Sequence, residues 1–218
     1  MKTDPERLIL ANTALMTPPH VPEIRLHLAD EAHDLWLKTE DELEAIGLPP
    51  PFWAFAWAGG QGLARHILDH RELVSGRQVL DFATGSGLVA IAAVRAGAKE
   101  VTAADIDPWS VTAARLNATE NRAGFDILHA DLIGQDRGWD TVLAGDVFYD
   151  RELAERVLPW FETLAARGCT VLIGDPGRAY CPRERFELIG RYQVPVTRAL
   201  EDSEIKATSV WQLPVAPR

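Results

Sequence analysis

Aspartate residues end several apolar runs of this sequence, and one of them has a tyrosine close behind it. In the segment GDVFYD, Asp146 ends an apolar run and Tyr149 follows three residues later, where the chain turns. A carboxylate and a phenol placed in this way can converge on one polar atom of a substrate. If that atom is an amine, the pair can accept its hydrogen bonds and aim its lone pair at an electrophile. Asp146 and Tyr149 are therefore the candidate catalytic residues.

Four more apolar runs lead to aspartate, at Asp81, Asp105, Asp131 and Asp175. In open α/β sheets the ligand lies over the carboxyl ends of the strands, so these side chains are candidates for one shared site. Asp131 can accept a hydrogen bond from an adenine amino group. Aspartate is also a common helix cap and turn former, and this second interpretation stays open for Asp131 and Asp175 taken alone.

The segment VLDFATGSG, residues 79–87, is the centre of this pattern. Its apolar start predicts a buried strand, its glycines predict a turn, and the following LVAIAAVRAGA predicts a helix. Glycines permit close approach of a ligand, and the helix N-terminus offers unpaired N–H groups. Asp105 follows Gly87 by 18 residues. That is close to the roughly 20 expected for an acidic side chain that binds a ribose, so a nucleotide-like cofactor is indicated.

Two cofactor classes fit such a unit, and an ordinary strand-to-helix turn is a third interpretation. Gly85, Gly87 and Ala90 satisfy the dinucleotide pattern G-x-G-x-x-G/A. Asp81 opposes it, because like charges about 4 Å apart repel by roughly 4 kcal/mol at an effective dielectric constant of about 20. S-adenosylmethionine has no phosphate, and its ammonium and sulfonium groups are attracted to a carboxylate. We therefore expect S-adenosylmethionine.

The apolar runs and the helical patterns between them predict an α/β fold with a doubly wound sheet. Two alternating runs near the C-terminus leave no room for a crossover helix and predict an antiparallel hairpin. Prolines near the N-terminus predict a loosely structured segment over residues 1–23. We expect parallel strands at residues 78–82, 100–105, 125–132, 139–146 and 170–175, helices at 30–46, 61–70, 108–122, 151–166 and 182–190, and the hairpin at 192–200 and 205–213.

Four aromatic residues lie just before the helix predicted at residues 61–70: Phe52, Trp53, Phe55 and Trp57. Large aromatic side chains are usually mostly buried, so these residues can simply fill the core. Their place just ahead of the central strand also allows one or two of them to wall a cofactor or substrate pocket. Both interpretations remain open at this point.

The composition argues against several other classes of protein. The 218 residues are 47% hydrophobic, enough for a sizeable core, and their net charge of −10 argues against binding nucleic acid through phosphate contacts. Cys169 and Cys181 lack metal-ligand and redox spacing, so we expect no metal site and a reducing compartment. The N-terminal segment lacks the apolar stretch of a signal peptide, and no later segment reaches membrane-spanning length. We expect a cytoplasmic protein without nucleic-acid or membrane partners.

These motifs together resemble the seven-strand, or class I, S-adenosylmethionine-dependent methyltransferases. The D-x-x-Y motif within GDVFYD resembles the protein-lysine methyltransferase branch of that family. PEIRLHLA, FWAFAWAGGQGLARHIL, ADIDPWSVTAARLNATEN, IGDPGR and TSVWQL extend the likeness along nearly the whole chain, toward the electron transfer flavoprotein β-subunit lysine methyltransferases. The sequence departs from them at Ala58, where proline is more usual, and at ATGSG, which replaces a GSGCG-like loop.

The resemblance implies a Rossmann-like fold with seven strands in the order 3-2-1-4-5-7-6. It also implies that Asp146 and Tyr149 serve a target lysine. We divide the chain into an N-terminal extension with a helix and an aromatic segment, residues 1–58, packed on a methyltransferase domain, residues 59–218. From the motifs and the resemblance together, we expect the cofactor to bind Trp57, Asp81, Ala83, Gly85, Ser86, Gly87, Asp105, Ile106, Asp131, Leu132 and Gly145.

The function implied is transfer of a methyl group from S-adenosylmethionine to lysine of a protein, with the β subunit of electron transfer flavoprotein as the substrate suggested by resemblance. A ribosomal protein or a small-molecule amine is the alternative acceptor. A dehydrogenase, or a nucleotide-binding protein without catalysis, is the alternative class. Asp81 weighs against the dehydrogenase, and the pair of Asp146 and Tyr149 weighs against a mere binding module.

Overall fold

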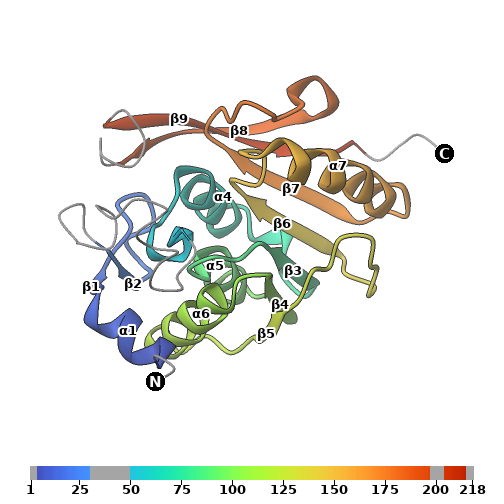
Figure 1. Cartoon of the computed structure of the whole chain (residues 1–218). Coiled ribbons are helices and arrows are strands. Elements are labelled where there is room, and N and C mark those ends of the chain that lie inside the picture. The colour runs from blue at the N-terminus through green and yellow to red at the C-terminus, as the bar shows by residue number, and fades with distance from the viewer. Residues whose placement is uncertain (1–3, 30–49, 197–203, 215–218) are drawn as a thin grey trace.

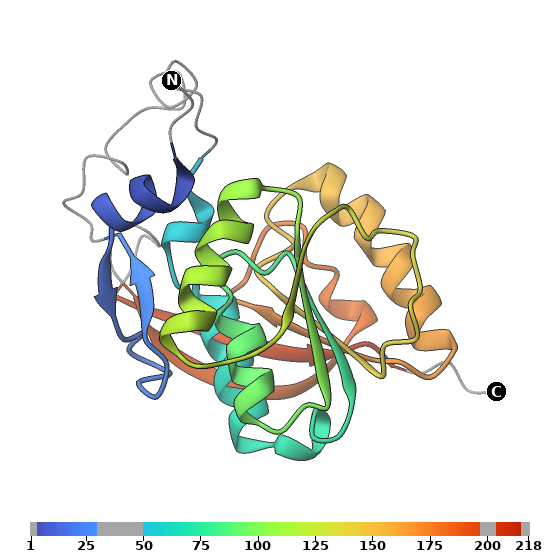
Figure 2. The same cartoon turned by 90° about the horizontal axis from the view of Figure 1, so that it is seen from below.

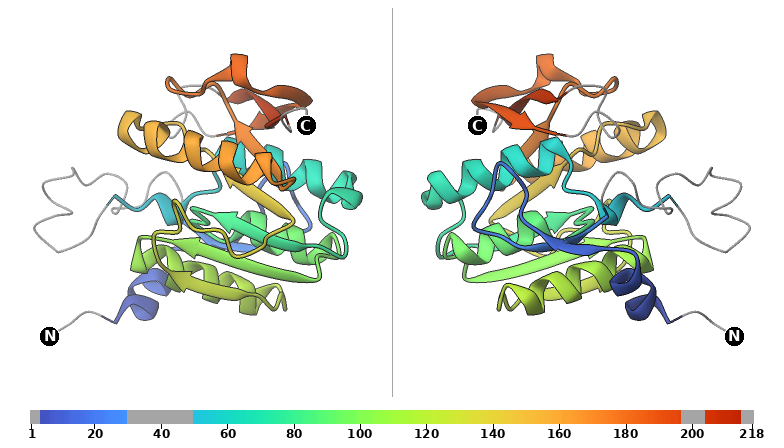
Figure 3. Two further views of the ribbon diagram at one scale, coloured as in Figure 1. Left: turned by 90° about the vertical axis from the view of Figure 1, so that its right-hand side faces the viewer. Right: turned by 90° about the vertical axis from the view of Figure 1, so that its left-hand side faces the viewer.

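A seven-stranded sheet in the order β5-β4-β3-β6-β7-β9-β8 forms the centre of the computed structural model (Figure 1). The structure describes residues 4–29, 50–196 and 204–214. Strands β3 to β7 pair in parallel, and β8 and β9 form an antiparallel hairpin at the edge opposite β5 (Figure 3). The order confirms the predicted fold class. The strands are β3 (Gln78–Phe82), β4 (Glu100–Asp105), β5 (Asp126–His129), β6 (Thr141–Gly145), β7 (Thr170–Asp175), β8 (Glu187–Pro195) and β9 (Ile205–Gln212).

Helices cover both faces of this sheet (Figures 1 and 2). Helices α4 (Ala58–Asp69), α5 (Leu88–Arg95) and α6 (Pro108–Glu120) lie on one side, and α7 (Arg151–Ala166) lies on the other. Along β3, Val79 packs with the residues of α4 and α5, whereas Leu80 packs with those of α7. Because both faces are buried there, β3, β6 and β7 consist largely of apolar residues, which is why the sequence predicted them well.

The N-terminal segment corrects one expectation. Residues 1–23 were predicted to be loosely structured, but the described part forms α1 (Pro5–Ala11) and β1 (Ala14–Met16), which pairs with β2 (Leu26–Leu28). Asp4 caps α1 by accepting a hydrogen bond from the backbone N of Glu6, and Pro5 occupies the first turn. Ile9 is fully buried. Pro5 therefore starts a helix, whereas Pro18, Pro19 and Pro22 lie in the segment between β1 and β2.

The N-terminal elements share the core of the rest of the protein. Helix α1 and strand β2 pack against α6 (Figure 2), and the buried side chains of Ile24 and Leu26 join the apolar cluster of α4 and α5. The division at residue 59 stays a prediction. The helix expected at residues 30–46 lies outside the described residues.

The segment predicted as a helix at residues 182–190 is instead a short 3-10 turn, η3 (Arg183–Arg185), followed by the first part of β8. The prediction was wrong because Phe186 and Ile189 also fit a helical spacing. Pairing with β9 decides the outcome, since β8 is bonded to it from Glu187 to Pro195. Gly190 also lets β8 pack against α4, because a Cβ there would lie 2.9 Å from Nδ1 of His66.

The four aromatic residues divide between core and pocket. Trp53 in η1 (Phe52–Ala54) and Phe55 are 2% and 3% exposed and pack with Ile9. Phe52 is 46% exposed, and together with Trp57 it faces the cavity described below. Among the residues that the structure describes, no helix is long and apolar enough to cross a membrane, and no cluster of His, Cys, Asp or Glu could hold a metal ion.

Candidate active site

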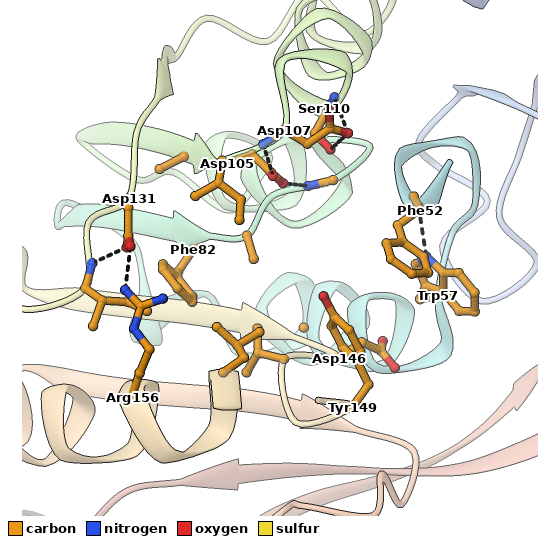
Figure 4. A pocket seen from close by; sticks show the side chains of 18 of the residues that line it. Phe52, Trp57, Phe82, Asp105, Asp107, Ser110, Asp131, Asp146, Tyr149 and Arg156 are labelled. Atoms are coloured by element: carbon orange, nitrogen blue, oxygen red, sulfur yellow. Dashed lines mark hydrogen bonds and ion pairs between the residues drawn. The ribbon is translucent and has the colours of Figure 1, made fainter. Parts of the chain in front are cut away.

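A cavity of about 410 Å³ lies over the carboxyl ends of β3, β4 and β6 (Figure 4). Small-molecule sites in proteins usually enclose about 300–1,000 Å³, so its size suits a nucleotide-like ligand. Nine of the predicted site residues line it: Trp57, Ala83, Gly85, Asp105, Ile106, Asp131, Gly145, Asp146 and Tyr149. The predicted catalytic pair therefore shares one cavity with the glycine loop and with two further acidic strand ends, Asp105 and Asp131.

Four predicted residues do not line this cavity: Asp81, Ser86, Gly87 and Leu132. Gly87 has φ +82° and begins α5, and a Cβ there would lie 3.2 Å from Cα of Ala114. The carbonyl oxygen of Ser86 accepts a hydrogen bond from Asn117. Leu132 is fully buried in the apolar cluster on the α7 side of the sheet. These residues hold the walls in place, and their direct contact with a cofactor stays a prediction.

Asp81 lies beneath the glycine loop. Its Oδ2 accepts hydrogen bonds from Oγ1 of Thr84 at 2.5 Å and from the backbone N of Ala90 at 3.0 Å, which ties the strand to the loop and to α5. Burial raises the pKa of Asp81 to about 7, against the lowering effect of these two bonds. The carboxyl group is therefore only partly charged near neutral pH, and its predicted attraction for a cationic cofactor stays a prediction.

Asp105 lies at the end of β4 and joins two loops. Its Oδ2 accepts a hydrogen bond from the backbone N of Gly85 at 2.9 Å, and its Oδ1 accepts one from Asp107 N at 3.0 Å. Burial raises the pKa of Asp105, and the two bonds only partly oppose that effect. Each carboxylate oxygen has a second lone pair, so Asp105 can still accept bonds from two adjacent hydroxyl groups.

Asp131 lies after β5 on another wall (Figure 4). Its Oδ1 accepts a hydrogen bond from Ile133 N at 3.0 Å, and its Oδ2 pairs with Nη2 of Arg156 at 2.6 Å. Burial raises the pKa of Asp131, but these bonds outweigh burial and the net pKa lies below its ordinary value. Phe82 lies near Asp131 in Figure 4, and Phe82, Ile133 and Leu153 line the cavity with apolar surface. A flat heterocycle with a polar edge fits such a slot.

Asp146 follows β6 in a backbone conformation that side chains rarely adopt, with φ +57°. Its backbone N donates to the carbonyl oxygen of Gly174, and its Oδ2 accepts a hydrogen bond from Gly60 N at 3.0 Å. Glycines make this approach possible: a Cβ on Gly59 would lie 2.4 Å from Oδ2 of Asp146. The first turn of α4 thus holds a buried carboxylate at the positive end of the helix dipole.

Arg178 binds the other oxygen of this carboxylate. Its Nη2 and Nε lie 2.6 and 2.9 Å from Oδ1 of Asp146, and its Cζ lies 5.6 Å from the centroid of the Trp57 ring. Tyr149 is 51% exposed, and its ring centroid lies 5.7 Å from that of Phe52. Burial, followed by the charges of Asp105 and Asp150, raises the pKa of Tyr149, so its phenol stays protonated at neutral pH.

Several residues that line the cavity were not predicted. Some lie in sequence segments that had been singled out, and others have no local sequence pattern that indicates them. Phe52 stood in the aromatic segment, and Arg178 stood in IGDPGR, but neither was assigned to the site. Arg156 lies on α7 and reaches Asp131 from 25 residues away, which no local pattern indicates. The unpredicted lining residues are Pro50, Phe52, Phe82, Ala104, Asp107, Ser110, Ala130, Ile133, Val147, Leu153, Arg156 and Arg178.

Comparisons with known proteins agree with the fold. The family model of the ribosomal protein L11 methyltransferases matches residues 63–147. A solved magnesium protoporphyrin IX methyltransferase from Synechocystis PCC 6803, with bound S-adenosylmethionine, has a TM-score of 0.54 and 18% identity, covering 71% of this chain and 76% of that one. At that identity the likeness shows the fold alone.

Two curated relatives reach much higher identity. The electron transfer flavoprotein β-subunit lysine methyltransferase of Xenopus laevis is 43% identical over 216 residues, 96% of this chain and 87% of the relative. The one from Danio rerio is 36% identical over 222 residues, 98% of this chain and 85% of the relative. On this evidence the chain belongs to the electron transfer flavoprotein β-subunit lysine methyltransferase family.

Proposed function

We propose that this protein transfers methyl groups from S-adenosylmethionine to lysine side chains of the β subunit of electron transfer flavoprotein. The observation that carries the proposal is the placement of Asp146 and Tyr149 in one cavity with the glycine loop and Asp105. The relatives that match nearly the whole chain are named for this substrate, whereas the ribosomal-protein family model matches only residues 63–147. Those residues contain the glycine loop, Asp105, Asp131 and Asp146 but not Tyr149 or the aromatic segment before Gly59, so that match supports the cofactor more than the acceptor.

The polar side chains that line the cavity fit S-adenosylmethionine better than a dinucleotide. Asp105 offers acceptors for two ribose hydroxyls, and Asp131 lies beside the apolar slot where an adenine amino group would accompany the ring. A Cβ built on Gly85 would meet nothing within 4 Å, so the loop leaves room for a ligand. The two arginines of the lining, Arg156 and Arg178, already pair with carboxylates, which leaves little for a pyrophosphate.

When bound, S-adenosylmethionine would supply an electrophilic methyl group, which the lysine nitrogen gains as the carbon–sulfur bond breaks. The protein must present that nitrogen unprotonated. The reference pKa of a lysine is about 10.4, so its deprotonation at pH 7 costs roughly 4.6 kcal/mol unless the site lowers that pKa. Asp146 and the phenol of Tyr149 would align the amine by hydrogen bonds, while its proton leaves to water before transfer.

Exposed apolar side chains around the cavity suit a protein acceptor. Phe52 and Tyr149 are about half exposed, and Ile106 is 69% exposed. A folded partner can cover these side chains and remove their apolar surface from water, whereas a small amine is too small to cover them. The net charge of −10 supports acceptors other than nucleic acid. The two cysteines are free, which supports a cytoplasmic location.

The test is a comparison of three acceptors under one set of conditions. The purified protein is incubated with S-adenosylmethionine labelled in its methyl group and with the β subunit of electron transfer flavoprotein, ribosomal protein L11 or n-butylamine. We expect label in the flavoprotein subunit alone. Label in L11 or the amine at a comparable rate would overturn the substrate assignment while leaving the cofactor assignment intact.

A further inference from the structure

Arg178 occupies the place where a substrate cation would be expected. The guanidinium binds Oδ1 of Asp146 through two nitrogens and lies over the face of Trp57. The Arg178 side chain is 21% exposed and that of Asp146 is 10% exposed, so the ion pair is largely shielded from water. A shielded carboxylate beside an aromatic ring is also a favourable environment for a lysine ammonium.

This ion pair resolves an electrostatic conflict in the proposed reaction, on which the present inference rests. An unpaired carboxylate favours the protonated form of a neighbouring amine, but methyl transfer requires the neutral form. Arg178 supplies one positive charge against the negative charge of Asp146. A lysine that enters beside them therefore meets a hydrogen-bond acceptor of nearly zero net charge.

The other groups around Asp146 do not replace this charge. The first turn of α4 contributes the N–H of Gly60 and no ionisable side chain. Tyr149, in the turn after β6, is a neutral phenol. Asp175 at the end of β7 and Asp105 across the cavity are acidic, and burial raises the pKa of both. Arg183, the first residue of η3, does not line the cavity, and its charge acts on Asp175 by lowering the pKa of that carboxyl group.

We propose that Arg178 is a positioning residue for methyl transfer, which neutralises Asp146 so that the target lysine enters the site as a free amine. Arg178 acts through Asp146 and does not contact the reacting atoms. Loss of Arg178 leaves Asp146 in place as a hydrogen-bond acceptor, but the unpaired carboxylate then favours the ammonium form of the lysine.

The pH dependence of turnover tests this role. Single-turnover rates are measured from pH 6 to 10 with the β subunit of electron transfer flavoprotein, for the wild type and for Arg178→Met and Arg178→Lys. We expect the rate of Arg178→Met to rise at a pH about one unit higher than that of the wild type. This shift corresponds to about a tenfold lower rate near neutral pH. Arg178→Lys keeps the charge and should stay close to the wild type. Arg185→Met removes an arginine from an ion pair with Glu162 outside the cavity and serves as the control.

A double variant isolates the action through Asp146. The double variant Asp146→Asn/Arg178→Met lacks both charges and so has the same zero net charge as the wild-type ion pair, and its profile should lie close to the wild-type position. This comparison remains decisive if Arg178→Met alone does not fold. A profile of the double variant that lies as far toward alkaline pH as is expected for Arg178→Met, or an unshifted profile in Arg178→Met, would overturn the inference alone. A faster rate of Arg178→Met at every pH would also overturn it, since Arg178 would then be blocking the site. A wild type that methylates no lysine of this substrate would refute the proposed function and the inference with it.

Discussion

Replacing Gly59 by alanine should displace Asp146 and slow methyl transfer. A Cβ at Gly59 would lie 2.4 Å from Oδ2 of Asp146 and 2.4 Å from the carbonyl oxygen of Gly174. Ordinary contact begins at 3.4 Å, so the helix turn and the carboxylate must separate by about 1.0 Å. Because a misplacement of about 1 Å can cost about 100-fold in rate, we expect kcat to fall by about that factor.

The neighbouring glycine provides a matched control. A Cβ at Gly60 would meet only Cγ2 of Val89, at 3.9 Å, which is an ordinary contact. Both substitutions place alanine in the first turn of α4, so they share any gain in helix propensity, about 0.5–1 kcal/mol. Gly60→Ala also keeps the backbone N–H that donates a hydrogen bond to Asp146. We expect it to turn over at nearly the wild-type rate, whereas overpacking should destabilise Gly59→Ala by about 1–3 kcal/mol.

Three measurements separate the expected effect from a general loss of folding. Thermal unfolding reports stability, calorimetry with S-adenosylhomocysteine reports the cofactor site, and single-turnover methyl transfer reports alignment. Gly59 does not line the cavity, so cofactor affinity should change far less than the rate. Equal transfer rates in the two alanine variants would refute the reasoning, because the close approach of α4 would then not control the position of Asp146.

Further predictions concern the cofactor, the phenol and the pH dependence of stability. Asp105→Ala should weaken binding of S-adenosylhomocysteine by about 1–3 kcal/mol in calorimetry, because ribose acceptors are lost; unchanged affinity would contradict the assignment. Tyr149→Phe should lower kcat about 3- to 10-fold through one lost hydrogen bond, with affinity for S-adenosylhomocysteine unchanged; a wild-type rate would remove the phenol from the reaction. Burial, with the charge of His70, lowers the pKa of His66 from 6.5 to about 4. The unfolded chain therefore takes up a proton that the native protein does not, and stability should fall as the pH decreases from 6.5 toward 4. Urea unfolding of His66→Gln should lose part of this slope, and an unchanged slope would exclude His66 as its source.

Local patterns predicted the central part of the molecule. Residues 78–95 form the expected strand, loop and helix, because a doubly buried strand needs a continuous apolar run and the loop needs glycine at φ +52° and +82°. The aspartates end strands whose carboxyl ends meet at one edge, so Asp105, Asp131 and Asp146 reach one cavity as expected. Each of these features depends on a few consecutive residues or on the parallel direction of the strands.

The features that were missed depend on contacts between distant segments. Asp146 accepts from Gly60, 86 residues earlier, and from Arg178, 32 residues later. The start of β8 was predicted to be helical because its apolar residues fit a helix as well as a strand, and only its pairing with β9 distinguishes the two. The bonds that Oδ2 of Asp81 accepts from Thr84 and Ala90 were also not predicted, and contact of Asp81 with a cofactor stays a prediction. Strand position shows where a side chain starts, and packing decides where it points.

Mass spectrometry of the modified substrate tests the proposed function most directly. The purified β subunit of electron transfer flavoprotein is incubated with S-adenosylmethionine and either the wild-type protein or Asp146→Ala, and its peptides are sequenced. We predict methyl groups on lysine side chains of this subunit with the wild type and only traces with Asp146→Ala. Methyl groups on residues other than lysine, or equal methylation by both proteins, would contradict the assignment of Asp146 to the acceptor lysine.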